Sequence, residues 1–217
     1  MKTNLNLKCC DCMKLMAKYP DNHFDLAIVD PPYGINFAKN YTTRTQDDKL
    51  GRRHKSKNWD DVIPNNDYFI ELFRVSKNQI IWGANYFPFL WENGCRGFVF
   101  WYKENPVDNF SDGELAYTSF NTPAKCFHFR YSGGLEGKTN ASKKIHPTQK
   151  PVKLYSWILQ NYAKEGDKIL DTHLGSGSIA IACHDLKYDL TGCEIDKDYF
   201  SSMLERVKIH QSQLSLF

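Results

Sequence analysis

Short apolar runs alternate with amphipathic stretches along most of the chain. The first clear run, Leu-Ala-Ile-Val at 26–29, is typical of a buried parallel strand. We predict further strands at 79–82, 97–102, 168–170 and 190–193, and helices at 13–19, 67–76, 152–163, 178–186 and from near 198 onward. Residues 115–120 and 125–131 flank Asn-Thr-Pro-Ala, which indicates an antiparallel hairpin. Strands that alternate with helices predict a doubly wound α/β fold with a mostly parallel sheet.

A basic segment interrupts this pattern at 38–60. It carries seven Lys or Arg against three acids, whereas the whole chain of 217 residues has a net charge of only +3. A long polar segment inside a compact domain is usually a functional loop or disordered. A second, much shorter connector at 132–144 is Gly-rich and basic. The length suits a single domain spanning 1–217 that contains both segments.

Composition excludes some classes of protein. No apolar run is long enough to cross a membrane, and no secretory leader is evident. The seven cysteines are an odd number and lack the paired spacing of a zinc site. We therefore expect a cytoplasmic protein with reduced thiols, no membrane partner and no bound metal.

Acidic residues follow three of the predicted strands. Asp30 follows 26–29, Asp171 follows 168–170, and Glu194 follows 190–193. Doubly wound sheets bind ligands at the carboxyl ends of their parallel strands, so the three acids are expected at one site.

The turn after Asp171 has the pattern of a nucleoside-binding loop. Gly175 and Gly177 permit a tight turn and close approach of a ligand to the backbone. Glu194 lies 23 residues beyond Asp171, where a carboxylate commonly accepts hydrogen bonds from ribose hydroxyls. This pattern fits a nicotinamide dinucleotide or S-adenosylmethionine. Ala180 stands where the dinucleotide fingerprint has its third glycine, which favours the second cofactor.

Asp30-Pro31-Pro32-Tyr33 suits chemistry on an aromatic amino group. Such a nitrogen is a poor nucleophile because its lone pair is delocalised into the ring. A carboxylate can accept one N–H bond, and a carbonyl held outward by the following proline can accept the other. Tyr33 offers a flat face to a base that has left its stack. A plain turn at the end of a strand is the alternative interpretation of this tetrapeptide.

Three segments together resemble the amino-group (N4/N6) DNA methyltransferases. Residues 30–33 resemble their catalytic signature, 171–178 their cofactor loop, and 146–151 the segment that holds the methionine end of the cofactor. The catalytic segment precedes the cofactor segment, which is similar to the circularly permuted beta class. The resemblance implies a Rossmann-like methyltransferase fold and S-adenosylmethionine as the cofactor.

The resemblance also implies roles for individual residues. Asp11 and Cys12 would face the cofactor's adenine, and Glu194 the ribose hydroxyls. Thr148 and Lys150 would meet the methionyl carboxylate. The family often has Pro-Phe where this chain has Thr172-His173, so His173 or Leu174 would cover the cofactor. The complete set of implied cofactor residues is Asp11, Cys12, Thr148, Lys150, Asp171, His173, Leu174, Gly175, Ser176, Gly177 and Glu194. Residues 82–85 resemble a further segment lining the cleft, with aromatic core packing as an equal alternative.

Duplex DNA is the implied partner. In this class the connector at 132–144 is the usual place for target recognition, but here it is very short. The basic segment is the other candidate, with phosphate-binding side chains in Lys39, Arg44, Arg52, Arg53, Lys55 and Lys57. A solvated loop remains the alternative for this segment.

The resemblance implies methylation of adenine N6, because Asp rather than Ser stands at the head of the catalytic signature. Cytosine N4 is the first alternative. An RNA or protein-amide methyltransferase, a DNA-binding module without catalysis and a dehydrogenase are further alternatives in falling order. The sequence leaves open whether the protein is a homodimer, and whether it acts with a restriction partner, in a phage or alone.

Overall fold

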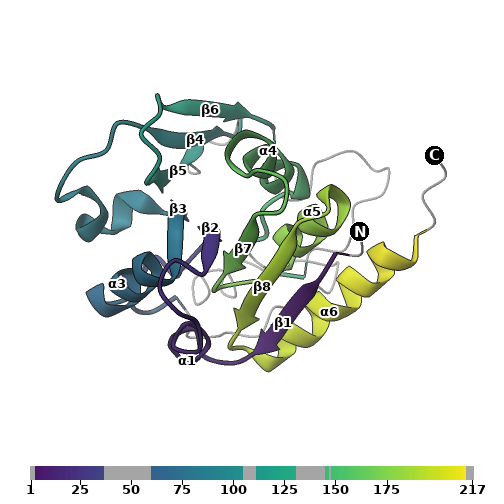
Figure 1. Cartoon of the computed structure of the whole chain (residues 1–217). Coiled ribbons are helices and arrows are strands. Elements are labelled where there is room, and N and C mark those ends of the chain that lie inside the picture. Colours follow the sequence, from purple (N-terminus) through teal and green to yellow (C-terminus); the bar gives the residue numbers. More distant parts are fainter. Residues whose placement is uncertain (1–2, 37–59, 105–110, 131–144, 147, 214–217) are drawn as a thin grey trace.

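The computed structural model describes residues 3–36, 60–104, 111–130, 145–146 and 148–213. In this part of the chain one sheet has the strand order β1-β8-β7-β2-β3-β5-β4-β6 (Figure 1). The strands are β1 Leu5–Cys9, β2 Phe24–Val29, β3 Ser76–Trp82, β4 Phe98–Tyr102, β5 Gly113–Thr118, β6 Lys125–His128, β7 Lys168–Asp171 and β8 Asp189–Glu194. The α-helices are α1 Cys12–Met16, α3 Asn66–Val75, α4 Val152–Tyr162, α5 Ser178–Leu186 and α6 Lys197–Ser212, and the short 3₁₀ helices are η1 Ala84–Tyr86 and η2 Pro88–Trp91.

Two hydrophobic cores cover the two faces of the sheet. β1, β8, β7, β2 and β3 run parallel, with Ala27 of β2 opposite Leu170 of β7. Successive side chains of a strand point to opposite faces. Ile28 therefore packs with α4, α5 and α6, whereas Ala27 and Val29 pack with α1 and α3. The result is a three-layer α/β domain, and the predicted fold class is confirmed.

The sequence interpretation missed one strand, β1. Its five residues alternate Leu-Asn-Leu-Lys-Cys, and they pair in parallel with β8 at one edge of the sheet. Its side chains are half-buried or exposed, so it lacks the continuous apolar run that marks β2.

The predicted hairpin between 115–120 and 125–131 is wrong. β5 pairs antiparallel with β3 and with β4, whereas β6 pairs in parallel with the outer side of β4. The connecting chain crosses the start of β4 at Gly97, where a Cβ atom would lie 2.1 Å from the carbonyl oxygen of Thr122. A close backbone crossing, rather than a tight turn, therefore joins β5 to β6. Within the described residues, the antiparallel pairs are β3 with β5 and β4 with β5.

Two predicted features lie outside the described residues. The basic segment at 38–60 is described only at Asp60, and the connector at 132–144 is not described. Within the described helices, none combines the length and apolar character that crossing a membrane requires.

The crossing at Gly97 generates a stability prediction. Gly97→Ala should lower the free energy of unfolding by about 1–3 kcal/mol, because the new methyl group must displace the backbone of Thr122. Gly94→Ala is the matched control. Gly94 has a φ of +65° and nothing within 4 Å of the added Cβ, so only the left-handed conformation costs energy there, about 1 kcal/mol. Urea unfolding measures both variants. A Gly97 variant as stable as the wild type would contradict the crossing.

Candidate active site

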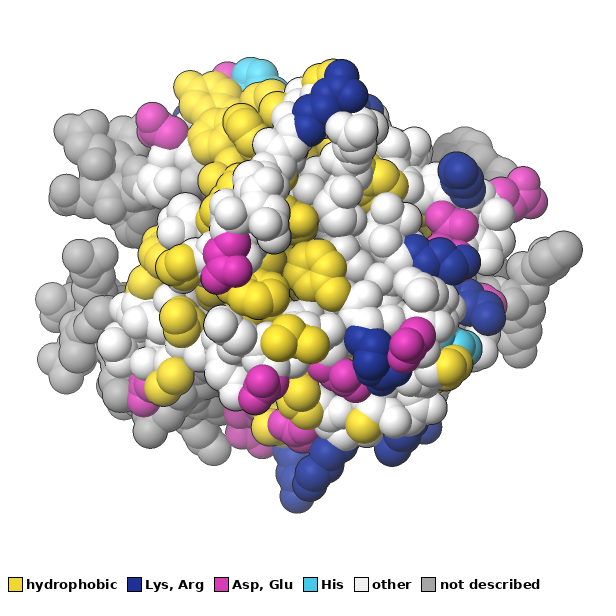
Figure 2. Space-filling view, turned by 60° about the vertical axis from the view of Figure 1, so that its left-hand side comes forward, with side chains coloured by type: hydrophobic (Ala, Val, Ile, Leu, Met, Phe, Trp, Pro, Cys, Tyr) yellow, Lys and Arg dark blue, Asp and Glu magenta, His cyan; other side chains and the backbone are white. Residues whose placement is uncertain are grey.

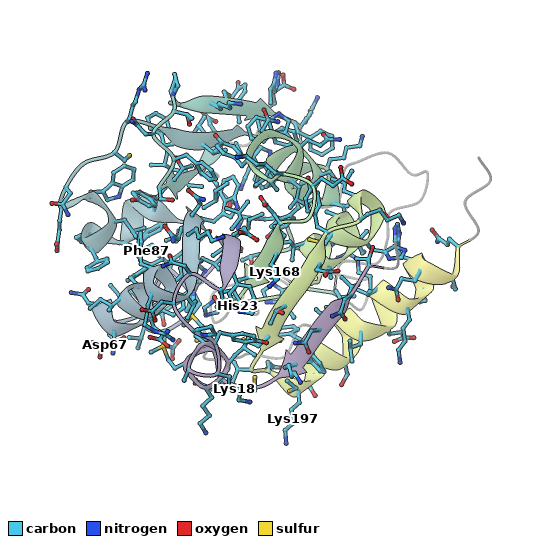
Figure 3. All side chains as sticks on the ribbon, viewed as in Figure 1. Lys18, His23, Asp67, Phe87, Lys168 and Lys197 are labelled. Carbon is cyan, nitrogen blue, oxygen red and sulfur yellow. The ribbon has the colours of Figure 1, made fainter. Side chains whose placement is uncertain are left out.

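Acidic side chains from separate strands meet at one edge of the sheet. Asp30 directly follows β2, Asp171 ends β7 and Glu194 ends β8. Because these strands are parallel neighbours, their carboxyl ends share this edge. At the opposite, amino-terminal ends of β2 and β7, His23 and Lys168 lie near each other (Figure 3).

Both oxygens of the Asp30 carboxylate are engaged. The Tyr33 hydroxyl donates to Oδ1 at 2.5 Å, and the Lys150 ammonium pairs with Oδ2. Lys150 Nζ also lies 3.3 Å from the Tyr33 hydroxyl and 3.1 Å from Glu114 Oε2. The other oxygen of Glu114 pairs with Lys103. The side chain of Asp30 is 17% exposed and that of Lys150 only 3%, so this ionic cluster is largely shielded from water.

A buried aspartate holds the loop that follows Asp30. Asp60 is 2% exposed, and its Oδ1 accepts the backbone N–H groups of Tyr33 at 2.8 Å and Gly34 at 3.0 Å. A carboxylate that binds successive backbone amides fixes the loop conformation. Asp60 therefore orients Tyr33 from outside the tetrapeptide.

The Tyr33 ring packs against the segment after β3. Tyr86 stacks on it with ring centroids 5.1 Å apart and an interplanar angle of 15°. A Cβ atom on Gly83 would lie 2.0 Å from the same ring, so this position admits only glycine. Tyr86 is 38% exposed. On the face that Figure 2 brings forward, the left-hand side of Figure 1, hydrophobic side chains gather near the centre. Segment 82–85 thus makes room for Tyr33.

A pocket of about 270 Å³ opens beside Pro32. Its walls come from the residues after β1, β2, β7 and β8, together with the start of α3 and the segment before it. The lining residues are Cys10, Asp11, Cys12, Met13, Pro32, Val62, Ile63, Pro64, Tyr68, Thr172, His173, Glu194 and Ile195. A largely apolar lining with a few polar groups is typical of a site for a small organic ligand.

Glu194 is the main acceptor in the pocket wall. Its Oε2 accepts the backbone N–H of Gly175 at 3.0 Å, and its Oε1 accepts that of Asp196 at 2.9 Å. Burial raises the pKa of Glu194 above its ordinary value of 4.5. A carboxylate has about four lone-pair sites, so two hydrogen bonds leave capacity for two hydroxyl donors from a ligand.

His173 contributes an uncharged ring to the same pocket. Its Nδ1 lies 2.9 Å from the Thr172 hydroxyl, which lies 2.7 Å from the Tyr68 hydroxyl. Burial lowers the pKa of His173 to about 4, so the ring is neutral near pH 7. Asp171 accepts the backbone N–H of His173 at 2.9 Å, and burial raises the pKa of Asp171 to about 8.

The predicted site residues occupy different places. Asp11, Cys12, His173 and Glu194 line the pocket. Leu174 packs in the core, where a Cβ atom on Gly192 would lie 2.7 Å from its side chain. The residues of the turn at 175–177 lead into α5.

Thr148 and Lys150, the two predicted cofactor residues of segment 146–151, contact different partners. The Thr148 hydroxyl lies 3.1 Å from His146 Nδ1, whereas the Lys150 ammonium turns to Asp30. The Lys150 carbonyl accepts the Ser178 hydroxyl at 2.7 Å, which ties this segment to the start of α5. Lys39, Arg44, Arg52, Arg53, Lys55 and Lys57 lie outside the described residues.

Sequence reasoning missed Glu114, Asp60 and Tyr68. Glu114 does carry a signal, since it is a single acid at the start of an apolar strand. Asp60 lies 26 and 27 residues from the amides that it binds, so no local pattern indicates the contact. Tyr68 reads as a core residue of an amphipathic helix, and it is buried, but it also lines the pocket.

Comparisons with known proteins agree with this geometry. Residues 121–205 match a family model of N6/N4 methyltransferases, described as DNA methylase. The Type II methyltransferase M.HpaI of Haemophilus parainfluenzae is 26% identical over 243 residues, which cover 93% of this chain and 73% of that protein. The Type II methyltransferase M2.MboI of Moraxella bovis is 27% identical over 247 residues, which cover 96% and 88%.

Solved structures share the fold. The M1.HpyAVI–SAM complex superimposes with a TM-score of 0.62 at 20% identity, covering 94% of this chain and 98% of that one. The cytosine-N4-specific PvuII DNA methyltransferase gives a TM-score of 0.60 at 12% identity, covering 97% and 92%. The family model matches residues 121–205 and the two relatives match nearly the whole chain, so the chain is similar to the N4/N6 DNA methyltransferases.

Proposed function

We propose that this DNA methyltransferase transfers the methyl group of S-adenosylmethionine to N6 of an adenine in duplex DNA. The observation that carries the proposal is the position of Asp30-Pro31-Pro32-Tyr33. Pro32 lines the pocket, while Asp30 and Tyr33 stand beside it. A base and a cofactor can therefore meet at this segment.

The pocket fits the nucleoside part of S-adenosylmethionine. Glu194 retains acceptor capacity for ribose hydroxyls. Asp11 and Cys12 are proposed to face the adenine, and His173 to cover the cofactor as a neutral ring. When bound, the cofactor supplies an electrophilic methyl group on a sulfonium.

The methionine end is assigned to Thr148 and to the turn formed by Gly175, Ser176 and Gly177, with Asp171 at its base. Lys150 receives a different role from the one that the resemblance implies. Its ammonium already contacts Asp30 and Glu114. We assign it to the catalytic carboxylate rather than to the cofactor.

Asp30 and Pro31 act together on the target amino group. Asp30 accepts one N–H bond, and the Pro31 carbonyl accepts the other, which directs the nitrogen lone pair toward the methyl group. As the nitrogen bonds to the methyl carbon, the bond from that carbon to sulfur would break and a neutral thioether would leave. The carboxylate of Asp30 would stabilise the positive charge on the nitrogen until one N–H proton is lost to solvent. Tyr33, supported by Tyr86, presents a face to the flipped base.

Adenine is favoured over cytosine because Asp30 heads the catalytic signature. The cytosine-N4-specific PvuII enzyme has the same fold, so the fold itself does not select the base. Cytosine N4 presents the same kind of amino group and remains the second candidate.

DNA binding is assigned to the basic segment at 38–60, where side chains would neutralise backbone phosphates. The connector at 132–144 remains a proposed target-recognition segment within a single domain spanning 1–217. The Type II relatives support a role in restriction–modification. A cytoplasmic location and a homodimer complete the proposal.

The identity of the labelled base tests the function. Wild-type protein incubated with methyl-labelled S-adenosylmethionine and unmethylated duplex DNA should yield labelled N6-methyladenine after digestion to nucleosides. Asp30→Asn should lower the rate by about 100-fold or more, because an amide supplies no negative charge to the nitrogen. Asp185→Asn, at an exposed pair with His210, is the control. Labelled N4-methylcytosine would change the assigned base, and an active Asp30 variant would refute the mechanism.

Cofactor affinity tests the role of Glu194. Glu194→Ala should weaken binding of S-adenosylmethionine by roughly 10- to 100-fold, because hydrogen bonds to a charged group contribute about 1.5–3 kcal/mol. Glu194→Gln keeps an oxygen acceptor and should lose less. Calorimetric titration measures the dissociation constants, with the exposed Glu165→Ala as control. Equal constants for the wild type and the alanine variant would remove Glu194 from the ribose role.

A further inference from the structure

Four charged side chains of alternating sign form a row behind the catalytic segment. Asp30 pairs with Lys150, Lys150 Nζ lies 3.1 Å from Glu114 Oε2, and Glu114 Oε1 pairs with Lys103. The side chains of Lys150, Glu114 and Lys103 are 3%, 24% and 18% exposed. Lys150, the least exposed member of the row, is the one that contacts the carboxylate of Asp30.

We propose that Glu114 is a positioning residue for methyl transfer, which holds the Lys150 ammonium beside Asp30 and offsets its positive charge. The proposal rests on the proposed function, because it assumes that Asp30 binds the target amino group. Nothing in the catalytic signature or the cofactor loop indicates this residue.

The antiparallel strand β5 brings Glu114 to the site. β5 runs opposite to β3, so its first residues lie at the edge where the parallel strands end. Glu114 is the second residue of β5 and pairs in register with Trp101 of β4. The topology thus delivers an acid from an amino-terminal strand end to a site otherwise built from carboxyl ends.

The signs of the charges determine how Glu114 affects Asp30. A cation against the Asp30 carboxylate weakens its attraction for the positive charge that develops on the target nitrogen. A second carboxylate at 3.1 Å on the other side of the ammonium offsets that cation. The rings of Trp82 and Tyr33, with centroids 5.5 and 5.8 Å from Lys150 Nζ, exclude water and strengthen each of these interactions.

The charge states are consistent with this arrangement. Burial disfavours the charged form of Lys150, yet Asp30 and Glu114 outweigh burial and raise its pKa above 10.5. Burial likewise opposes ionisation of Glu114, but Lys150 and Lys103 lower its pKa to about 2. Both groups are therefore ionised across the neutral range.

Among the described residues, further titratable groups at this cluster are Tyr33 and Asp171, which interact with Lys150, and Tyr155 of α4, which interacts with Asp30 and Glu114. Burial raises the pKa values of both tyrosines well above 10, so they stay neutral. Burial raises the pKa of Asp171 to about 8, and the charges that shift it most are those of Asp30, Glu194 and Lys150 rather than Glu114. A difference between wild type and variant therefore reports Lys150.

The experiment compares Glu114→Gln, Glu114→Asp and Glu104→Gln with the wild type. Glu104 pairs with His128 at an exposed position and serves as the control. Glu114→Gln should lower kcat for DNA methylation by about 10- to 100-fold, the usual effect of removing a group that supports a catalytic ligand. The dissociation constant of S-adenosylmethionine and the KM for DNA should stay within about twofold of the wild type. Glu114→Asp keeps the charge with a shorter reach, and it should recover part of kcat.

The pKa of Lys150 gives a readout that is independent of catalysis. NMR titration of protein labelled at lysine Cε, with the signal assigned through Lys150→Met, should show its pKa about 1–3 units lower in Glu114→Gln. A lysine cation is lost as the pH rises through its pKa. Loss of the cation removes the charge that opposes Asp30, so the kcat of Glu114→Gln should recover toward that of the wild type as the pH rises through the lowered pKa of Lys150.

The outcomes separate the two proposals. The role of Glu114 is overturned if the wild type is active and Glu114→Gln has the same kcat and the same Lys150 pKa as the wild type. A Glu114→Gln variant that is only less stable, with a normal kcat for its folded fraction, also overturns the role of Glu114. A wild type that transfers no methyl group to DNA overturns the proposed function, while the NMR titration still decides whether Glu114 sets the charge of Lys150.

Discussion

A lysine ammonium with 3% of its side chain exposed stays charged only if carboxylates replace the water that it has lost. Lys150 finds one partner in Asp30, 120 residues earlier in the chain, and another in Glu114. This contact joins the segment after β2 to the segment before α4. The Lys150 carbonyl then accepts the Ser178 hydroxyl, so the same residue also connects to the turn that begins α5. The segment at 30–33 and the turn at 175–177 are thereby held in one framework.

Two glycines support this framework, because each allows a close contact that a side chain would block. Gly83 leaves room for the Tyr33 ring, and Gly97 leaves room for the chain that crosses from β5 to β6. Asp60 fixes the backbone of Tyr33 from the other side. Tyr33 is therefore held by a ring stack, a backbone clamp and the hydrogen bond to Asp30. Such redundancy is expected where a side chain must present a fixed face to a substrate.

The site combines groups with opposite responses to burial. Burial keeps His173 neutral and favours the protonated form of Asp171, because neither has a nearby partner strong enough to offset desolvation. Lys150 and Glu114 remain charged in the same region because each faces opposite charges. Whether a titratable side chain in the cleft is charged therefore depends more on nearby opposite charges than on its residue type.

The sequence alone determined the alternation of strands and helices, the meeting of Asp30, Asp171 and Glu194 at one sheet edge, and the nucleoside-binding pattern of the loop at 171–178. Those features are local, since hydrophobic periodicity and turn chemistry act over a few residues. Only the tertiary structure decided that β6 joins β4 rather than β5, that Asp60 binds the Tyr33 loop, and that Lys150 turns to Asp30 and Glu114. These contacts connect residues tens of positions apart through steric fit and charge pairing. Local sequence patterns do not predict these contacts, because strand order and side-chain direction are established only when the layers pack.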